Sequence, residues 1–258
     1  LAALKIKHNW KDGDEVIVPA VTFVATINVI FQNNLTPVLV DVQEDTYNIN
    51  PNLIEEKITD KTVCILPVHL LGLPADMEAI NNIAKKHNIK VVEDSCETMF
   101  AEVNGKKVGS LGDIGCFSTY MAHFIVTGVG GFTTTNDPEL AILLKSLINH
   151  GRDNIYLNID DDKKEDEKEL YEVVAKRFNF TNIGFSYRAT EMEAAIGVSQ
   201  MEQKDWIVKK RQENAAYLTK ELQPLTQLQL PSIPKNLTHT FMIYGITVKD
   251  QPKRDLVN

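Results

Sequence analysis

One histidine, His123, lies in the middle of the stretch FSTYMAHFIVTGVGGFTTTND, which covers residues 117–137. The pattern predicts a short apolar strand, an irregular turn with a group of glycines, and a second strand. Imidazole takes up and releases a proton near neutral pH, so a histidine in such a loop is a candidate acid–base group. A loop histidine with satisfied hydrogen bonds also fits these residues, and from the loop alone it is the simpler interpretation.

Hydroxyl groups and glycines surround this histidine. Ser118 and Thr119 precede it, and Gly128, Gly130 and Gly131 follow it. Hydroxyl groups and open backbone N–H groups together can hold a phosphate. Glycines this close also occur in ordinary tight turns, and the spacing is neither a GxGxxG fingerprint nor a Walker loop.

Asp94 is a second candidate, because it ends the apolar run IKVVED (residues 89–94). A carboxylate at the end of a buried strand needs a cation or a strong hydrogen-bond donor, since burying it alone is costly. Asp94 is therefore either the partner of a protonated ring nitrogen or a helix cap or structural hydrogen-bond acceptor. His69, which follows the apolar residues LPV, is another polar side chain at a strand end.

The three cysteines, Cys64, Cys96 and Cys116, predict neither a metal site nor a disulfide scaffold. There is no CxxC pair, and the histidines are not at ligand spacing from the cysteines. We interpret Cys64 and Cys116 as core residues and Cys96 as a small buried residue, in a protein of the reducing cytoplasm. No Ser-His-Asp or GxSxG arrangement is visible.

The elements that must position these residues alternate between strands and helices. Apolar strands are predicted at residues 15–19, 36–42, 62–68 and 89–94, with helical patterns between them. This order predicts an α/β fold with a mostly parallel sheet between helices. Ligands of such sheets bind outside the carboxyl ends of the strands, which is where Asp94 is expected.

Helix-start signals mark the rest of the chain. Asn50 with Pro51, Asp137 with Pro138, and Thr190 with Glu193 three residues on predict three capped helices. A further helix is predicted at 209–223, and HTFMIYGITV (residues 239–248) reads as a strand.

Two domains are expected from this order. Residues 1–204 would form the large domain, and residues 205–258 the linking helix and the start of a smaller α+β domain. Because LAALKI at the start and KRDLVN at the end both read as parts of helices, we expect a fragment that lacks both ends of a longer protein.

The composition is that of an ordinary globular protein. The chain has 258 residues, 43% of them hydrophobic, and a net charge of −8. The negative charge argues against non-specific binding of nucleic acid or anionic membranes, and no 18-residue apolar run or signal-peptide pattern is present. We expect a cytoplasmic protein with neither partner. The charge run at 158–170 is interpreted as a solvated loop or exposed helix start.

Seven sequence blocks in order resemble the DegT/DnrJ/StrS family of sugar aminotransferases. They include GDEVIVPAVTFVATINVI, PVHLLGLPADMEAI, VVEDSCET, TGVGGFTTTND and IGFSYRATEMEAAIG. The resemblance implies the aspartate-aminotransferase-like (fold-type I) architecture, a pyridoxal 5'-phosphate or pyridoxamine 5'-phosphate cofactor, and a homodimer with sites at the subunit interface.

The resemblance also implies roles for single residues. Phe23 would stack on the cofactor ring, Asp94 would pair with its protonated nitrogen, and Glu97 replaces the usual Gln or His beside its hydroxyl. Ser118 would bind the cofactor phosphate. Ser186 stands where the family usually has an Asn that reaches the phosphate of the neighbouring subunit.

His123 occupies the position of the family's cofactor-linking lysine. Imidazole cannot form that stable covalent link, but it can move protons. The same replacement is typical of the sugar 3-dehydratase branch, which includes GDP-4-keto-6-deoxymannose 3-dehydratase. It implies 3-dehydration of a nucleotide-linked 4-keto-6-deoxyhexose, with glutamate as possible amino donor, in O-antigen or other surface-sugar synthesis. The absence of cysteine between Asp153 and Phe178 makes an iron–sulfur cluster there unexpected.

Two alternatives stay open. One is a sugar aminotransferase of the same family. The other is a non-catalytic relative that binds a sugar nucleotide or pairs with an active subunit.

Overall fold

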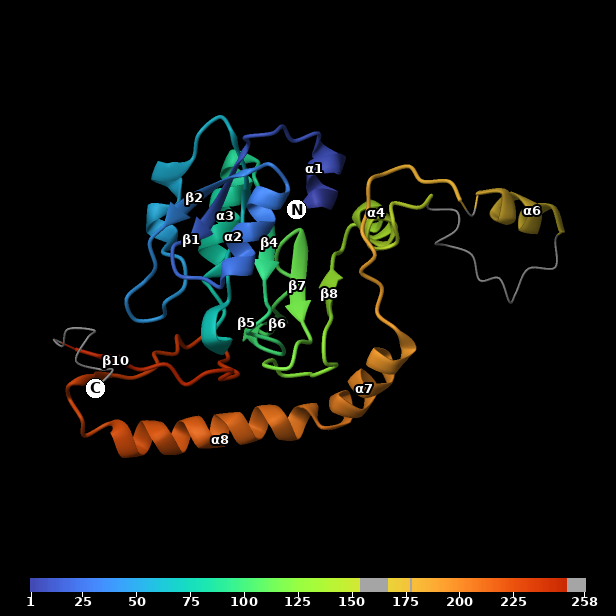
Figure 1. Ribbon diagram of the computed structural model, residues 1–258. Helices are drawn as coiled ribbons and strands as arrows, with labels where there is room; N and C mark the ends of the chain where they lie inside the picture. The colour runs from blue at the N-terminus through green and yellow to red at the C-terminus, as the bar shows by residue number, and fades with distance from the viewer. Residues whose placement is uncertain (154–166, 177, 250–258) are drawn as a thin grey trace.

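The computed structural model describes residues 1–153, 167–176 and 178–249, which are built around a six-stranded sheet (Figure 1). The strand order is β2-β1-β3-β4-β7-β8. The strands are β1 (Glu15–Pro19), β2 (Thr36–Val40), β3 (Thr62–Ile65), β4 (Lys90–Asp94), β7 (Ile114–Ser118) and β8 (Gly131–Thr134). All neighbours pair in parallel except β7 and β8, so the mostly parallel α/β sheet is confirmed.

Helices and short ribbons surround this sheet. The α-helices are α1 (Ala2–His8), α2 (Val24–Gln32), α3 (Met77–His87), α4 (Pro138–Ile148), α6 (Glu167–Lys176), α7 (Glu191–Glu202) and α8 (Lys204–Leu222). The 3-10 helices are η1 (Pro51–Leu53), η2 (Glu55–Lys57) and η3 (Leu70–Gly72). Two small antiparallel pairs join β5 (Glu102–Val103) to β6 (Lys106–Lys107) and β9 (Leu228–Gln229) to β10 (Thr247–Val248).

The core has two layers because successive strand residues point to opposite faces of the sheet. In β1, Val16 and Val18 pack in the cluster that contains Leu4 of α1, whereas Ile17 packs in the cluster that contains Ile80 of α3. All five side chains are fully buried. Each such side chain contributes about 1.5–3 kcal/mol relative to an exposed one, which explains why the strands read as continuous apolar runs.

The helix-start signals act as expected. Asp137 accepts hydrogen bonds from the backbone N–H groups of the first turn of α4, and Thr190 with Glu193 forms the capping box of α7. Asn50 caps residue 52 in the same way, but the helix expected there is two separate 3-10 turns, η1 and η2.

The strand expected at 239–248 is wrong for most of its length. Only Thr247–Val248 forms strand, as β10. Phe241 has φ 53°, in the left-handed region that interrupts a strand, and Thr240 and Ile243 donate their N–H groups to the backbone of η3 instead of to a sheet. This segment is therefore a loop fastened to η3.

Other expectations near the ends fall partly outside the described residues. Of the charge run 158–170, only the part from Glu167 is described, and this part begins α6. The segment KRDLVN at the end of the chain lies outside the described residues. Gln203 separates α7 from α8, close to the expected boundary at Asp205. The division into domains 1–204 and 205–258 stays a prediction. None of the helices among the described residues has the length and apolar character needed to cross a membrane.

Candidate functional site

Several candidate residues lie at the carboxyl edge of the parallel sheet. Asp94 ends β4 and pairs with Cys116 of β7, so Ser118 at the end of β7 lies on the same edge. Phe23 follows β1 and is the N-cap residue of α2, with 69% of its surface exposed. The parallel topology thus brings together residues that are far apart in the chain.

Asp94 has hydrogen-bond donors on both carboxylate oxygens. The Thr26 hydroxyl donates to Oδ2 (2.9 Å), and the backbone N–H of Cys96 donates to Oδ1 (3.2 Å). A carboxylate offers about four acceptor positions, so these two donors leave capacity for another. Thr26 in turn receives a hydrogen bond from Thr22 (2.8 Å), which ties the first turn of α2, with Phe23, to Asp94.

Sequence reasoning missed Thr26. The signal that was available is the pair of threonines four residues apart at the start of a helix, because residues at that spacing share a face. The acceptor of the Thr26 hydroxyl, the carboxylate of Asp94, lies 68 residues further along and was not deducible from the local pattern.

The loop between β7 and β8 holds His123. Its base is closed by Thr119 and Thr127, whose hydroxyl oxygens are 2.7 Å apart, and the His123 N–H donates to the carbonyl of Tyr120 (3.0 Å). The Nδ1 atom of His123 is buried and has no hydrogen-bond partner. An unpaired buried polar atom costs about 1–3 kcal/mol, so the loop keeps this imidazole in a conformation whose hydrogen-bonding capacity is unused.

Of the residues predicted to hold a phosphate, Ser118 has a hydroxyl proton available, whereas Gly131 has a purely structural role. The Ser118 hydroxyl oxygen accepts a hydrogen bond from the N–H of Tyr120 (3.2 Å) and keeps its own proton for another partner. Gly131 pairs with Ser118, and a Cβ at Gly131 would collide with the backbone oxygen of Phe117. This glycine is therefore explained by strand pairing alone.

Glu97 and Ser186 have different surroundings. Glu97 follows β4 and accepts a hydrogen bond from the N–H of Leu71 (2.7 Å), which has φ 59° in η3. Ser186 is exposed, and its backbone pairs with Asn149 beyond α4. The described contacts thus leave Ser186 apart from the other candidate residues.

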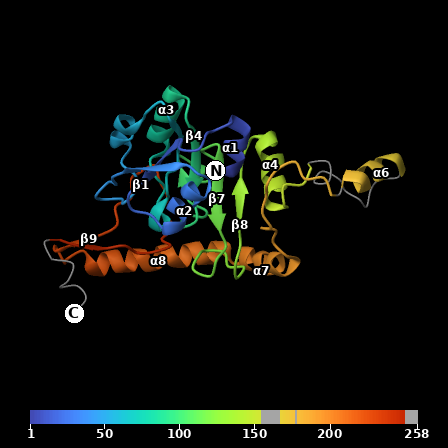
Figure 2. The same cartoon turned by 45° about the horizontal axis from the view of Figure 1, so that its top comes forward.

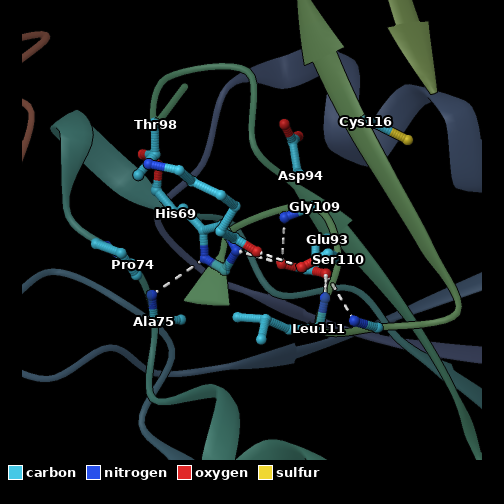
Figure 3. Close-up of polar contacts among 12 residues, drawn as sticks. His69, Pro74, Ala75, Glu93, Asp94, Thr98, Gly109, Ser110, Leu111 and Cys116 are labelled. Atoms are coloured by element: carbon cyan, nitrogen blue, oxygen red, sulfur yellow. Dashed lines mark hydrogen bonds and ion pairs between the residues drawn. The ribbon is translucent and has the colours of Figure 1, made fainter. Parts of the chain in front are cut away.

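His69 does not belong to the ligand-facing edge. Its imidazole and the carboxylate of Glu93 are both 0% exposed, with Nε2 3.1 Å from Oε2 (Figure 3). His69 Nδ1 accepts from the N–H of Ala75 (3.1 Å), so Nε2 carries the proton and donates to Glu93. The strand-end position suggested a ligand contact, but the alternation of β4 turns Glu93 and its partner away from Asp94 (Figure 3).

Glu93 is fully satisfied. Oε2 also accepts from the N–H of Gly109 (2.7 Å), and Oε1 accepts from those of Leu111 (2.7 Å) and Gly112 (2.6 Å). Burial raises the pKa of Glu93, but the hydrogen bonds from His69 and these N–H groups outweigh it and hold the pKa below its ordinary value. This pair fastens the 109–112 turn to β4.

The cysteines are free thiols. Cys64 is buried as expected and Cys116, although partly buried, packs against the core cluster, whereas Cys96 is only partly buried. Burial first, and the adjacent Asp94 carboxylate second, raise the pKa of the Cys96 thiol well above its usual range; burial raises that of Cys116 to about 11. Within the described ranges, no three His, Cys, Asp or Glu side chains gather as metal ligands would.

A cavity of about 680 Å³ lies beside the β7–β8 loop. Thr127, Gly130, Ala194 and Gly197 line it, between the loop and α7. Because its lining contains neither Asp94 nor His123, we do not assign the cofactor to it.

Comparison with known proteins identifies the family of the chain. The model of the DegT/DnrJ/EryC1/StrS aminotransferase family matches residues 1–258. GDP-perosamine synthase of Caulobacter vibrioides is 35% identical over 252 residues, 95% of this chain and 62% of that protein. GDP-4-keto-6-deoxy-D-mannose 3-dehydratase of Yersinia pseudotuberculosis is 36% identical over 216 residues, 84% of this chain and 54% of that protein.

The fold agrees with solved structures of the same group. The E. coli GDP-4-keto-6-deoxy-D-mannose-3-dehydratase with bound hydrated PLP superposes with a TM-score of 0.85 and 29% identity, over 99% of this chain and 66% of that one. The fold-type I architecture is therefore confirmed. The chain spans about three fifths of the length of the curated relatives it matches, 62% of the Caulobacter protein.

Proposed function

The chain belongs to the DegT/DnrJ/EryC1/StrS aminotransferase family, whose members depend on pyridoxal phosphate, and on that premise we propose that the whole protein is a pyridoxamine 5'-phosphate-dependent sugar 3-dehydratase. Its substrate would be a nucleotide-linked 4-keto-6-deoxyhexose, with glutamate as amino donor. The observation that carries the proposal is His123, a histidine whose buried Nδ1 is unpartnered in the loop where the family resemblance puts a lysine.

The residues present fit such a cofactor. Asp94 has acceptor capacity left for a protonated ring nitrogen, Phe23 offers an exposed aromatic face, and the Ser118 hydroxyl keeps a proton for a phosphate oxygen. Glu97 would lie beside the ring hydroxyl. Ser186 would serve the phosphate of the neighbouring subunit, which implies a homodimer.

When bound, the cofactor supplies an amine for a ketone substrate and an electron sink for proton removal. His123 would remove a proton through its imidazole and would donate it to the departing C3 hydroxyl of the sugar, which would leave as water. Asp94 would hold the proton on the ring nitrogen. Surface-sugar synthesis, including O-antigen, is the proposed setting.

An aminotransferase is the second candidate, favoured by the similarity to GDP-perosamine synthase. It is the weaker one because transamination in this family relies on a lysine, and position 123 is histidine.

The proposal is tested with the full-length protein. It is incubated with pyridoxamine 5'-phosphate, glutamate and GDP-4-keto-6-deoxymannose, and the mass of the sugar product is measured by mass spectrometry. A 3-deoxy sugar is expected; an amino sugar would replace the proposal with the aminotransferase. If the sugar is unchanged, titration with the cofactor decides: no binding means a non-catalytic relative, and tight binding directs the assay to other nucleotide-linked 4-keto sugars.

The lysine position is tested separately. His123→Lys with pyridoxal 5'-phosphate should restore a covalent link to the cofactor, seen as a new visible absorbance band and as a mass increase after borohydride reduction. Bound cofactor without either signal would mean that His123 does not occupy the lysine position.

A further inference from the structure

Arg211 of α8 makes three contacts that the proposed reaction does not use. Its Cζ atom lies 4.9 Å from the centroid of the Phe124 ring. Its Nη1 donates hydrogen bonds to the backbone oxygens of Phe241 (3.2 Å) and Met242 (2.9 Å). Arg211 is partly buried, and both hydrogen bonds lie in partly buried surroundings. Cation–π contacts and charged hydrogen bonds are strongest under that condition.

The aromatic partner of Arg211 is the residue next to His123. Phe124 is 2% exposed and packs in a small cluster with Met99, Ile125 and, from α8, Ile207. The loop is thus held at two places: Thr119 and Thr127 close its base, and Phe124 anchors its tip. His123 lies between these anchors, so the place of Phe124 limits where the imidazole can point. Figures 1 and 2 both show α8 passing along the end of the molecule where the β7–β8 connection lies.

The carbonyls that Arg211 contacts belong to a loop that also reaches Glu97. Ile243 donates its N–H to the oxygen of Leu71 (3.2 Å), and Leu71 donates its own N–H to Glu97 (2.7 Å). Residues 239–243 are therefore linked to the His123 loop through Arg211 and to Glu97 through Leu71.

We propose that Arg211 is a positioning residue for His123, which it acts on through Phe124 while it fixes residues 239–243. The planar guanidinium is suited to both tasks, because its face covers a ring while its edge donates to carbonyls. Lysine carries the same charge but has no such plane. The kinetic part of the inference rests on the proposed function; the structural part does not.

The test uses full-length protein, without substrate, in which the histidines are labelled with ¹³C at Cε1. The chain has six histidines among residues 1–258, and His123→Asn identifies the signal of His123 by its loss. In Arg211→Met we expect that signal to shift by several tenths of a part per million or to broaden. The matched control is Lys210→Met, the exposed neighbour on the same helix, which should leave the signal unchanged.

Turnover supplies the second measurement. Arg211→Met should lower kcat at least tenfold with KM within about twofold, and Arg211→Lys should recover less than half of the loss. Phe124→Leu should give a similar loss, and adding Arg211→Met to it should cost little more, since both act through one contact.

An unchanged His123 signal in folded Arg211→Met would overturn the inference, whatever happens to turnover. A loss of turnover that only follows a loss of folded protein, measured by thermal unfolding, would do the same. If no sugar is turned over but the His123 signal still responds to Arg211 and not to Lys210, the positioning stands and the proposed function fails.

Discussion

Two neighbouring residues of β4, Glu93 and Asp94, carry carboxylates into two very different surroundings. Glu93 lies with His69 in a fully buried group in which every carboxylate oxygen has two donors. Asp94 lies at the open edge, with one donor on each oxygen, and His123 in the adjoining loop has a buried nitrogen with no partner.

The difference teaches how to separate structural from functional polar groups. A buried carboxylate with all its hydrogen bonds made stabilises the fold and has nothing left to offer a ligand. An imidazole with an unpaired nitrogen costs about 1–3 kcal/mol, and such a cost is expected where a site is prepared for a ligand. By this criterion Glu93 and His69 belong to the scaffold, whereas Asp94 and His123 keep the free hydrogen-bonding capacity that the proposed site requires.

The largest expected effect is at His123. His123→Asn should lower dehydration about 10²–10⁴-fold, which is the usual contribution of general acid–base catalysis, while cofactor binding and unfolding temperature stay nearly unchanged. Steady-state kinetics, cofactor titration and thermal unfolding measure the three. His87→Asn, at the end of α3, is the control and should keep full turnover. Retained turnover in His123→Asn would remove this residue from the mechanism.

Glu93→Gln should have the opposite effect to His123→Asn: the protein should lose stability but keep its turnover. The substitution replaces a carboxylate that accepts four hydrogen bonds with an amide whose NH₂ group faces N–H donors, and each lost hydrogen bond to a charged group costs about 1.5–3 kcal/mol. We expect about 3 kcal/mol less free energy of unfolding in urea, with turnover per folded molecule preserved. Glu55→Gln, whose carboxylate is half exposed beside Lys86 and His87, should cost less than about 1 kcal/mol. Equal losses in the two variants would contradict the comparison.

Asp94→Asn separates the two interpretations of that residue. A neutral amide keeps the Thr26 hydrogen bond but cannot hold a protonated ring nitrogen, so kcat should fall about 100-fold, or about 2.7 kcal/mol in the barrier. Unfolding free energy should change by less than about 1 kcal/mol. The matched control is Asp113→Asn, directly before β7, whose carboxylate pairs with Lys90 at the start of β4. Lost stability with normal turnover would make Asp94 a structural residue.

The smallest expected effect concerns His239, which resembles His69 because its Nδ1 accepts a backbone N–H, that of Phe241 (3.0 Å). Burial lowers the pKa of His239 to about 4. Because the folded pKa lies below the unfolded value of about 6.5, the unfolded state binds the proton first, and stability falls as pH drops from 6.5 toward 4.

At pH 5 this coupling costs about 2 kcal/mol relative to pH 7. His239→Asn, which offers an oxygen in place of Nδ1, should flatten the plot of unfolding free energy against pH between 7 and 5. An unaltered slope would mean that another group controls acid stability there. Glu93 acts at lower pH: its stabilisation, present above its ordinary pKa, is lost as the pH falls through its lowered folded value.

The sequence by itself determined the features that depend on neighbouring residues. The alternation of Val16, Ile17 and Val18 fixed two apolar faces, and Asp137 and Thr190 marked helix starts, because a side chain that caps a helix reaches backbone only two or three residues away. The block pattern identified the family and the fold, and it singled out His123.

Only the tertiary structure decided which polar residues are satisfied. His69 and His123 look alike in the sequence, yet one donates to a buried glutamate and the other retains an unpaired nitrogen. The hydrogen bond from Thr26 to Asp94 joins residues that are 68 positions apart in the chain. The hydrogen bond from Arg211 to Phe241 joins a helix to a loop that lies 30 residues further along. The left-handed turn at Phe241, in a stretch with the composition of a strand, follows from its hydrogen bonds to distant segments. Such contacts depend on where the folded chain places remote groups, and a local pattern carries no record of them.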